Sequence, residues 1–284
     1  MDKYLLIAFA ICGISVMIHQ SLAFVVALIR KNNGIADIAW GLGFIIICAC
    51  SLFVHSLLIN IERPLGFNPT FILLITLVTI WGLRLSGYLF IRNWNKPEDW
   101  RYANWREEWG TKFFLKSYLQ VFLLQGFLML VIASPIILSG FYSLPAALIS
   151  YSVVHYTLIA TGITVWLIGF FFEAVGDSQL AGFKQDPANK GRIMRYGVWQ
   201  YTRHPNYFGE ASMWWGIFLL SCVSAHGVID ILRRAIGPAT ITFMLLRVSG
   251  VTMLESKYKG NKEYEDYQKR TSAFIPMPTK KGAV

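Results

Sequence analysis

The chain is poor in charged residues. Asp, Glu, Lys and Arg make up 15% of its 284 residues, whereas soluble domains carry about 25%. Hydrophobic residues make up 55%, and the mean hydropathy is +0.48. Such a composition excludes intrinsic disorder and a collagen-like structure. The four cysteines lie inside apolar stretches without a C-x-x-C pair, which excludes a secreted disulfide scaffold.

Common nucleotide and metal motifs are also missing. The chain has neither G-x-G-x-x-G after a strand nor G-x-x-x-x-G-K-[ST], which excludes a Rossmann dinucleotide fold and a P-loop. The five histidines are scattered and form no H-E-x-x-H motif, so we expect no metal site. Only His204 lies in a polar cluster.

Long apolar stretches take the place of these motifs. They cover residues 4–29, 35–61, 70–91, 113–140, 152–176, 207–232 and 236–256. Each reaches the length of about 20 residues that a helix needs to cross a bilayer. Because lipid offers the backbone no hydrogen-bond partners, we predict an all-α integral membrane protein with seven transmembrane helices.

The lysines and arginines indicate the orientation of these helices. They concentrate in alternate connecting segments, and the other segments hold only Lys3, Arg63, Arg233 and Arg234. The positive-inside rule then places the N-terminus outside and the C-terminus in the cytoplasm. We therefore expect a multi-pass protein, in the inner membrane if bacterial, with its polar site open to the cytoplasm.

A few charged residues fall within or at the edge of a span, where each costs a few kcal/mol and usually faces a cavity or a partner. These residues are Asp37, Arg84, Glu173, Asp177, Glu210, Arg247 and Glu255. If the helix continues past residue 176, Glu173, Asp177 and Lys184 share an arc of about 40°.

Two further groups repeat helical spacing. Asn206 and Glu210 are four residues apart, and Arg247, Glu255 and Tyr258 fall within about 80° of one another on a continuous helix. These charges either line a site or neutralise one another and hold the bundle together.

The segment GRIMRYGVWQYTRHPNYFGE at 191–210 is the densest polar stretch. Arg192, Arg195, Arg203 and His204 are candidate donors to phosphate or carboxylate groups. Pro205 suits the first turn of the next helix, whose free amides favour a nearby anion.

The aromatic residues and the histidine of this segment leave alternatives open. Trp199, Tyr201 and Tyr207 either stack on a planar ring or belong to the interfacial aromatic belt. His204 is a phosphate donor, a proton carrier or a structural cap.

Several of these stretches resemble the steroid 5-alpha-reductase family. The run from Glu173 to Gly209-Glu210, then Arg247, Leu254-Glu255 and a terminal E-Y-x-x-Y…F-I-P, resembles that family's C-terminal domain. The whole chain is similar to its bacterial branch of uncharacterised membrane proteins, with NNGIADIAWGLGF at 32–44, WGLRLSGYL at 81–89 and EDWRY at 98–102.

The resemblance implies a fold and an activity. The family has seven transmembrane helices, binds NADPH from the cytoplasmic side and reduces the double bond of a lipid enone such as a 3-oxo-4-ene steroid. We accordingly expect a part for the lipid at 1–140 and a part for the cofactor at 141–284. Expected partners are membrane lipids and a lipid or steroid-like substrate, without nucleic acid, for a chain that can act as a monomer.

The resemblance also implies site residues. The family motif N-x-x-S-D with a basic residue seven positions on corresponds to Glu173, Gly176, Asp177 and Lys184, and Glu173 departs from the family's asparagine. The remaining cofactor-site positions are Arg192, Arg195, Arg203, His204, Asn206, Tyr207, Glu210, Arg247, Glu255 and Tyr258. The cations would hold the phosphates, and Asn206, Glu210 and Tyr258 would orient the nicotinamide.

The family's catalytic pair is a glutamate on the second span and a tyrosine on the third. Asp37 is the acid nearest to the first position, and Trp81 occupies about the second. Tyr88 lies on the same helical face as Trp81 and is the alternative tyrosine. A protonated Asp37 or Tyr88 would donate to the enolate oxygen.

Two other functions remain open. Isoprenylcysteine and phospholipid methyltransferases that use S-adenosylmethionine share the R-H-P-x-Y-x-G-E run at 203–210 and a later acid at Glu255. The segment 176–184 favours the reductase, because it has no counterpart in those enzymes. The third interpretation is a lipid-binding or scaffold protein without catalysis.

Overall fold

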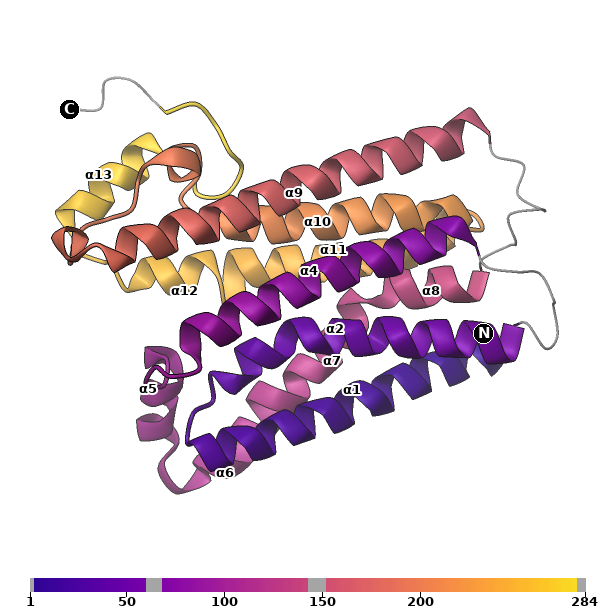
Figure 1. Ribbon diagram of the computed structural model, residues 1–284, viewed down its shortest axis with the longest axis horizontal. Coiled ribbons are helices and arrows are strands. Elements are labelled where there is room, and N and C mark those ends of the chain that lie inside the picture. The colour runs from indigo at the N-terminus through magenta and orange to yellow at the C-terminus, as the bar shows by residue number, and fades with distance from the viewer. Residues whose placement is uncertain (1–2, 60–67, 143–151, 280–284) are drawn as a thin grey trace. The chain divides into compact units, whose positions relative to one another are not determined.

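The structure, a computed structural model, describes residues 3–59, 68–142 and 152–279. These residues form helices joined by turns (Figure 1), so the predicted all-α fold class is confirmed. Within this part of the chain, six helices are long and apolar enough to cross a membrane.

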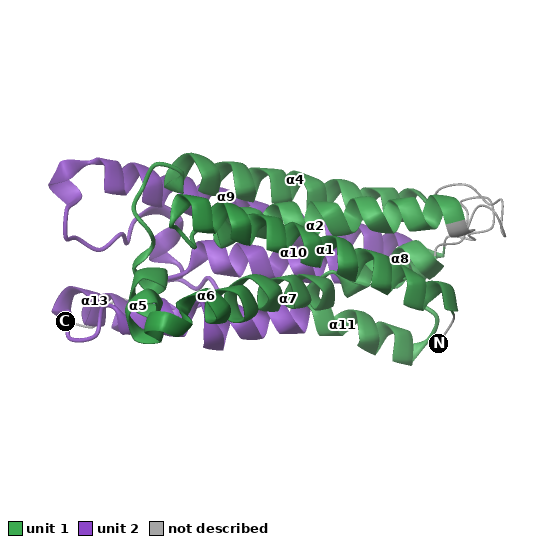
Figure 2. Cartoon of the chain, turned by 90° about the horizontal axis from the view of Figure 1, so that it is seen from below, with its two compact units in different colours: residues 1–152, 221–237 green, residues 153–220, 238–284 purple. Residues whose placement is uncertain are grey.

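The chain divides into two compact units (Figure 2). Unit 1 comprises residues 1–152 and 221–237, and unit 2 comprises residues 153–220 and 238–284. Residues 221–237 thus belong with the N-terminal residues, although the sequence suggests a simple division near residue 140.

Unit 1 is built from long membrane helices and one short polar helix. Its elements are α1 Lys3–Arg30, α2 Ile35–Val54, the π-helical η1 His55–Ile59, α4 Pro69–Asn93, α5 Trp100–Trp109, η2 Gly110–Lys112, α6 Phe113–Lys116, the π-helical η3 Ser117–Leu123, α7 Leu124–Ile132, α8 Ser134–Tyr142, η7 Cys222–Ser224 and the first part of α11 Val228–Phe243. Helix α2 packs against both α1 and α4. Gly41 and Gly82 allow the second contact, because a methyl group at Gly41 would lie 2.5 Å from the Gly82 carbonyl oxygen.

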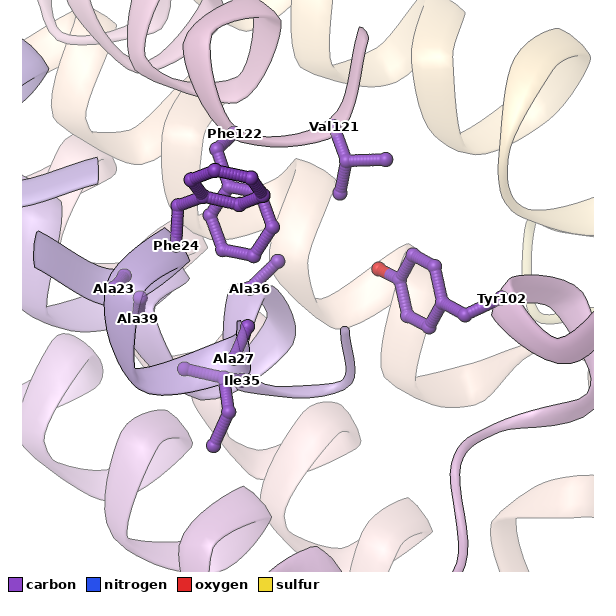
Figure 3. Packing of buried hydrophobic residues seen from close by; sticks show 9 residues of the cluster. All are labelled: Ala23, Phe24, Ala27, Ile35, Ala36, Ala39, Tyr102, Val121 and Phe122. Carbon is purple, nitrogen blue, oxygen red and sulfur yellow. The ribbon is translucent and has the colours of Figure 1, made fainter. Parts of the chain in front are cut away.

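A buried cluster holds the polar helix α5 against the ends of α1 and α2 (Figure 3). Phe24 of α1 packs with Phe122 at a ring distance of 5.2 Å, and Tyr102 of α5 joins the same cluster with Ala36 of α2. Asp99 caps α5 by accepting a hydrogen bond from the Arg101 backbone N–H at 3.0 Å. This packing brings α5 residues next to the start of α2.

The predicted span 113–140 is not one helix. α7 ends at Ile132, a turn follows at Ala133, and α8 begins at Ser134. Pro135 has no N–H to donate to the preceding turn, so the helix cannot continue through it unchanged.

The predicted spans 207–232 and 236–256 are wrong in their boundaries. α10 ends at Ser221, and α11 starts at Val228 and runs through the predicted break at 233–235. Gly227 has φ +83, which makes the turn, and Asp230 accepts a hydrogen bond from the His226 N–H at 3.1 Å. Apolar composition on both sides hides this turn from a hydropathy argument.

Unit 2 contains a long helical hairpin and a C-terminal polar region. Its elements are α9 Val153–Gln185, η5 Pro187–Asn189, η6 Gly197–Gln200, α10 Pro205–Ser221, the end of α11, the π-helical η8 Met244–Val248, α12 Val251–Ser256 and α13 Lys262–Arg270. Helix α9 continues past residue 176, as the alignment of Glu173, Asp177 and Lys184 requires. The bend at Ser249 and Gly250 separates η8 from α12, so the predicted shared face of Arg247, Glu255 and Tyr258 is wrong.

Glycines spaced seven residues apart bring α9 and α10 together. A methyl group at Gly169 would lie 2.5 Å from the Gly209 carbonyl oxygen, and one at Gly216 would lie 2.7 Å from the Gly162 carbonyl oxygen. The two helices are therefore antiparallel and in backbone contact, as small residues allow in membrane proteins. We call this contact the glycine seam.

Candidate functional site

Two acids of α9 lie on the glycine seam. Glu173 is 2% exposed and Asp177 is 5% exposed. Asn206, in the first turn of α10, donates a hydrogen bond from Nδ2 to Asp177 Oδ1 at 3.4 Å. Because a buried charge is costly unless it is paired or hydrogen-bonded, these acids indicate a built polar site rather than a lipid-facing surface.

The loop between α9 and α10 folds back onto α9 near these acids. Gln179 accepts a hydrogen bond from the Val198 N–H at 3.0 Å, and Trp199 donates from Nε1 to the Gly176 carbonyl at 3.0 Å. Trp199 is buried, so it belongs to the scaffold rather than to an exposed stacking surface. The loop is thus held against the polar end of the hairpin.

Glu255 of α12 binds side chains from the end of this loop and from α13. Arg203 binds it through Nε at 2.8 Å and Nη2 at 3.2 Å, His204 Nε2 lies at 3.1 Å, and Gln268 Nε2 donates at 2.8 Å. Arg203 also donates from Nη1 to the Thr271 carbonyl at 2.6 Å. We call this group the Glu255 cluster.

His204 belongs to the Glu255 cluster. The imidazole is buried and binds Glu255 on one side, while its face stacks on Tyr207 at a ring distance of 5.5 Å. These contacts give His204 and Arg203 a structural part at the corner before α10.

Three cations of the expected cofactor site lie outside that cluster. Lys184, Arg192 and Arg195 are exposed. Lys184 follows Asp177 by two helical turns on α9, and Arg195 lies 4.0 Å from the Glu263 carboxylate. Exposed guanidinium and ammonium groups so close in sequence provide the donor set that phosphates require.

The other expected cofactor residues are distributed over unit 2. Glu210 lies half-buried on α10, next to Gly209 of the seam. Tyr258 stacks on Tyr264 at a ring distance of 4.5 Å. Arg247 is exposed in η8, beyond the bend that precedes α12, so the fold does not bring it onto a common helix face with Glu255.

Two buried tyrosines of α13, Tyr264 and Tyr267, lie in the C-terminal region. The Tyr267 hydroxyl donates to the Trp199 carbonyl, and Thr202 donates from Oγ1 to the Phe274 carbonyl at 2.8 Å. Burial raises the pKa of Tyr267 and of Tyr264 above their ordinary value. The loop before α10 is therefore tied to the chain's last described residues.

Unit 1 holds a second polar group around Asp37. Arg101 donates from Nη2 to Asp37 Oδ2 at 3.0 Å, and the Tyr102 hydroxyl donates to Asp37 Oδ1 at 2.7 Å. Arg101 also donates from Nε to Asp99 at 2.8 Å. Asp37 thus accepts hydrogen bonds from two side chains of α5.

The two aromatic candidates of α4 differ in environment. Trp81 is buried and packs edge-on against Phe44 at 5.3 Å, which makes it part of the core. Tyr88 is half-buried, and the Arg92 guanidinium lies 5.1 Å from its ring centre.

Arg101 and Tyr102 are not among the residues that the sequence predicts for a site. They belong to the EDWRY run, which carries only a resemblance, and spacing alone does not connect residue 102 to residue 37. The sequence signal that points to them is an acid at the start of the second span together with an Arg-Tyr pair in the polar segment after the third span. Among the described residues, no group of three or more His, Cys, Asp or Glu could hold a metal ion.

The fold and these polar groups define a multi-pass helical membrane protein with buried acids at one end of a helical hairpin. Residues 23–271 match the family described as proteins of unknown function, DUF1295, and the chain belongs to this family.

Curated relatives connect the chain to steroid enzymes. It is 28% identical over 117 residues to 3-oxo-5-alpha-steroid 4-dehydrogenase 1 of Rattus norvegicus, and 29% identical over 117 and 118 residues to the proteins of that name from Mus musculus and Bos taurus. Each match covers 41% of this chain and 40% or 41% of the relative. The resemblance to steroid 5-alpha-reductases is thereby confirmed. No solved structure matches the chain significantly.

Proposed function

We propose that the chain is a membrane oxidoreductase that uses NADPH to reduce the carbon–carbon double bond of a lipid enone, such as a 3-oxo-4-ene steroid. The names of the curated relatives specify a 3-oxo steroid and position 4. The observation that carries the proposal is the hydrogen bond between Asn206 and buried Asp177, with the exposed Lys184 two turns further along α9. The resemblance assigns these three residues to the cofactor site.

The residues of unit 2 fit the cofactor in their chemistry. Lys184, Arg192 and Arg195 would hold the phosphates, since all three are exposed cationic residues. Glu173 lies one turn from Asp177, about 6 Å further from Lys184 along the axis. That distance suits an acid that accepts from ribose hydroxyls or the nicotinamide amide instead of meeting phosphate. The Glu255 cluster would hold the loop in position.

Unit 1 would bind the lipid and supply a proton. When bound, NADPH supplies a hydride to the β carbon of the enone, and the electron pair moves to the carbonyl oxygen. The Tyr88 hydroxyl would donate a proton to that oxygen. Asp37, which Arg101 holds in place, is the other candidate.

The test uses the purified full chain in detergent. NADPH should raise its thermal unfolding temperature, because a ligand that binds only the folded state stabilises it. A 3-oxo-4-ene steroid should then cause loss of NADPH absorbance. Asp177→Asn should weaken NADPH binding roughly tenfold to a hundredfold, as expected for one hydrogen bond to a charged group.

Tyr88→Phe separates the catalytic part of the proposal from the binding part. The variant should bind NADPH normally and lower kcat roughly 100-fold or more. Asp266→Asn, an exposed acid paired with Lys269, is the control and should behave as wild type. Unchanged turnover in Asp177→Asn would contradict the cofactor site.

S-adenosylmethionine provides the competing arm of the same measurement. Arg203 and His204 of the R-H-P-x-Y-x-G-E run belong to the Glu255 cluster, which is compatible with both a reductase and a methyltransferase. The run itself therefore does not distinguish these two enzymes. Stabilisation by S-adenosylmethionine but not by NADPH would establish the methyltransferase interpretation instead. Stabilisation by neither would favour a non-catalytic protein.

A further inference from the structure

A cavity of about 150 Å³ with charged and apolar lining residues lies in unit 1 where α1 ends. Arg30 and Asn32 line it from the α1–α2 turn, and Trp94 and Lys96 line it from the segment after α4. The cavity is smaller than the roughly 300–1,000 Å³ of sites for drug-sized ligands. It therefore suits a small charged group rather than a whole cofactor.

The Arg30 side chain is oriented although it is exposed. It donates from Nη2 to the Trp94 carbonyl at 2.6 Å, and its guanidinium lies 4.3 Å from the Trp94 ring centre. An arginine has five N–H donors, so this contact holds the group in place and leaves most of its donor capacity for a ligand. A preorganised guanidinium is well suited to phosphate.

The turn that carries Arg30 is tied to the segment that carries Lys96. Asn32 accepts a hydrogen bond from the Gly34 N–H at 2.8 Å and donates from Nδ2 to the Lys96 carbonyl at 3.3 Å. The two cations of the cavity are therefore held on one framework.

The balance of charge in the cavity is positive. Asp99 also lines it, but its carboxylate accepts hydrogen bonds from the Arg101 N–H and Nε at 3.0 and 2.8 Å. Arg101, which does not line the cavity, thus offsets the negative charge of Asp99. The positive charges of Arg30 and Lys96 then outweigh the negative charge within the cavity.

We propose that this cavity binds the phosphate group of an anionic phospholipid. Ile29 is 76% exposed and directly precedes Arg30 at the end of α1, and Ile91 is 85% exposed and lies two residues before Asn93, which lines the cavity at the end of α4. Both helices are long and apolar enough to span the bilayer. Their ends present apolar side chains for acyl chains next to cations for a headgroup, with an amphipathic Trp94 at the boundary. The inference does not depend on the proposed reductase activity.

The experiment measures retention of phosphatidylglycerol and phosphatidylcholine by the delipidated full chain, using native mass spectrometry in detergent. Wild type should retain phosphatidylglycerol preferentially. Arg30→Gln and Lys96→Gln should each weaken that binding about fivefold, the effect of one basic residue at a membrane surface. Lys112→Gln removes an exposed charge that does not line the cavity and is the matched control.

Two results would overturn the proposal. One is equal retention of phosphatidylglycerol by both cavity variants and Lys112→Gln. The other is a thermal stabilisation by inorganic phosphate that Arg30→Gln abolishes while lipid retention stays unchanged, which would assign the cavity to a soluble anion. Lys96→Gln keeps the test valid if Arg30→Gln fails to fold, because the hydrogen bond of residue 96 to Asn32 uses its backbone carbonyl.

Discussion

Arg234 is fully buried in α11, where its guanidinium binds Asp230 through Nε at 3.1 Å and Nη2 at 3.0 Å. Its Nη1 donates to the Ser139 hydroxyl at 2.9 Å and the Ser221 carbonyl at 2.6 Å. The sequence predicts a loop here, because two adjacent arginines are costly in a span. The partner four residues earlier on the same helix makes burial possible.

Arg234→Met should destabilise the protein by about 3–5 kcal/mol, since it leaves Asp230 as a buried unpaired charge. The neighbouring Arg233 is exposed, so Arg233→Met should change the thermal unfolding temperature little. The double variant Asp230→Leu/Arg234→Met should recover much of the loss. Equal unfolding temperatures for the two single variants would show that the ion pair contributes little.

Tyr267 allows a pH-dependent prediction. Its raised pKa means that the folded state holds the proton more tightly than the unfolded state. The corresponding stability is fully present below the ordinary tyrosine pKa of about 10 and is lost as the pH rises above it. Tyr267→Phe should cost about 1 kcal/mol at neutral pH and reduce the loss of stability at alkaline pH. Tyr201→Phe, at an exposed position, should leave the profile unchanged.

At the scale of secondary-structure elements, the glycine seam sets the spacing of α9 and α10. Gly169→Ala should destabilise the hairpin by about 1–3 kcal/mol, because the added methyl group meets the backbone of α10. Gly182 lies on the same helix with no atom within 4 Å of an added Cβ. Gly182→Ala should therefore stabilise the helix by about 0.5–1 kcal/mol. Thermal unfolding of the two variants in detergent compares them, and a loss of stability in both would contradict a specific seam.

The sequence predicts the helices better than it predicts their ends. Apolar length predicts the helices around residues 4–29, 70–91 and 152–176 because no turn interrupts them and each contains at most one charged residue. It failed near Gly227 and Ala133, where the chain turns within continuously apolar sequence. Tertiary contacts such as those of Arg234 decide these places, and hydropathy contains no information about them.

The candidate site residues also divide into those that helical spacing predicts and those that only the fold brings together. The acids Glu173 and Asp177 and the start of α10 could be predicted because they lie on helices with regular spacing. The sequence presents Arg203 as a candidate donor to a ligand and leaves His204 open between a ligand donor, a proton carrier and a structural cap. In the structure both bind Glu255, which is about 50 residues away in sequence and reaches them only through the fold. The contact between Asp37 and Tyr102 was missed for the same reason.

At the scale of the whole molecule, the number of crossings sets the relative sides of the termini. Six described helices meet the length and hydropathy of a span, and α10, with 17 residues, is slightly shorter than the usual 20 or so. We predict that α10 crosses as well, with the N-terminus outside and the C-terminus in the cytoplasm. A green fluorescent protein fused to the C-terminus should then fluoresce, and alkaline phosphatase fused to the N-terminus should be active. Reporters that place both termini on one side would establish an even number of crossings.

The seven-residue spacing of the glycines has a mechanical consequence. Seven residues fall about 20° short of two full helical turns, so the line of contact drifts around α9 from Gly162 to Gly176, and α10 must wind with it to stay in touch. Because backbone meets backbone at several points along this line, changes of side-chain rotamer alone cannot absorb a relative sliding of the two helices. The pair should then move as a single stiff rod, and a shift at the loop end should be transmitted over the full length of α10.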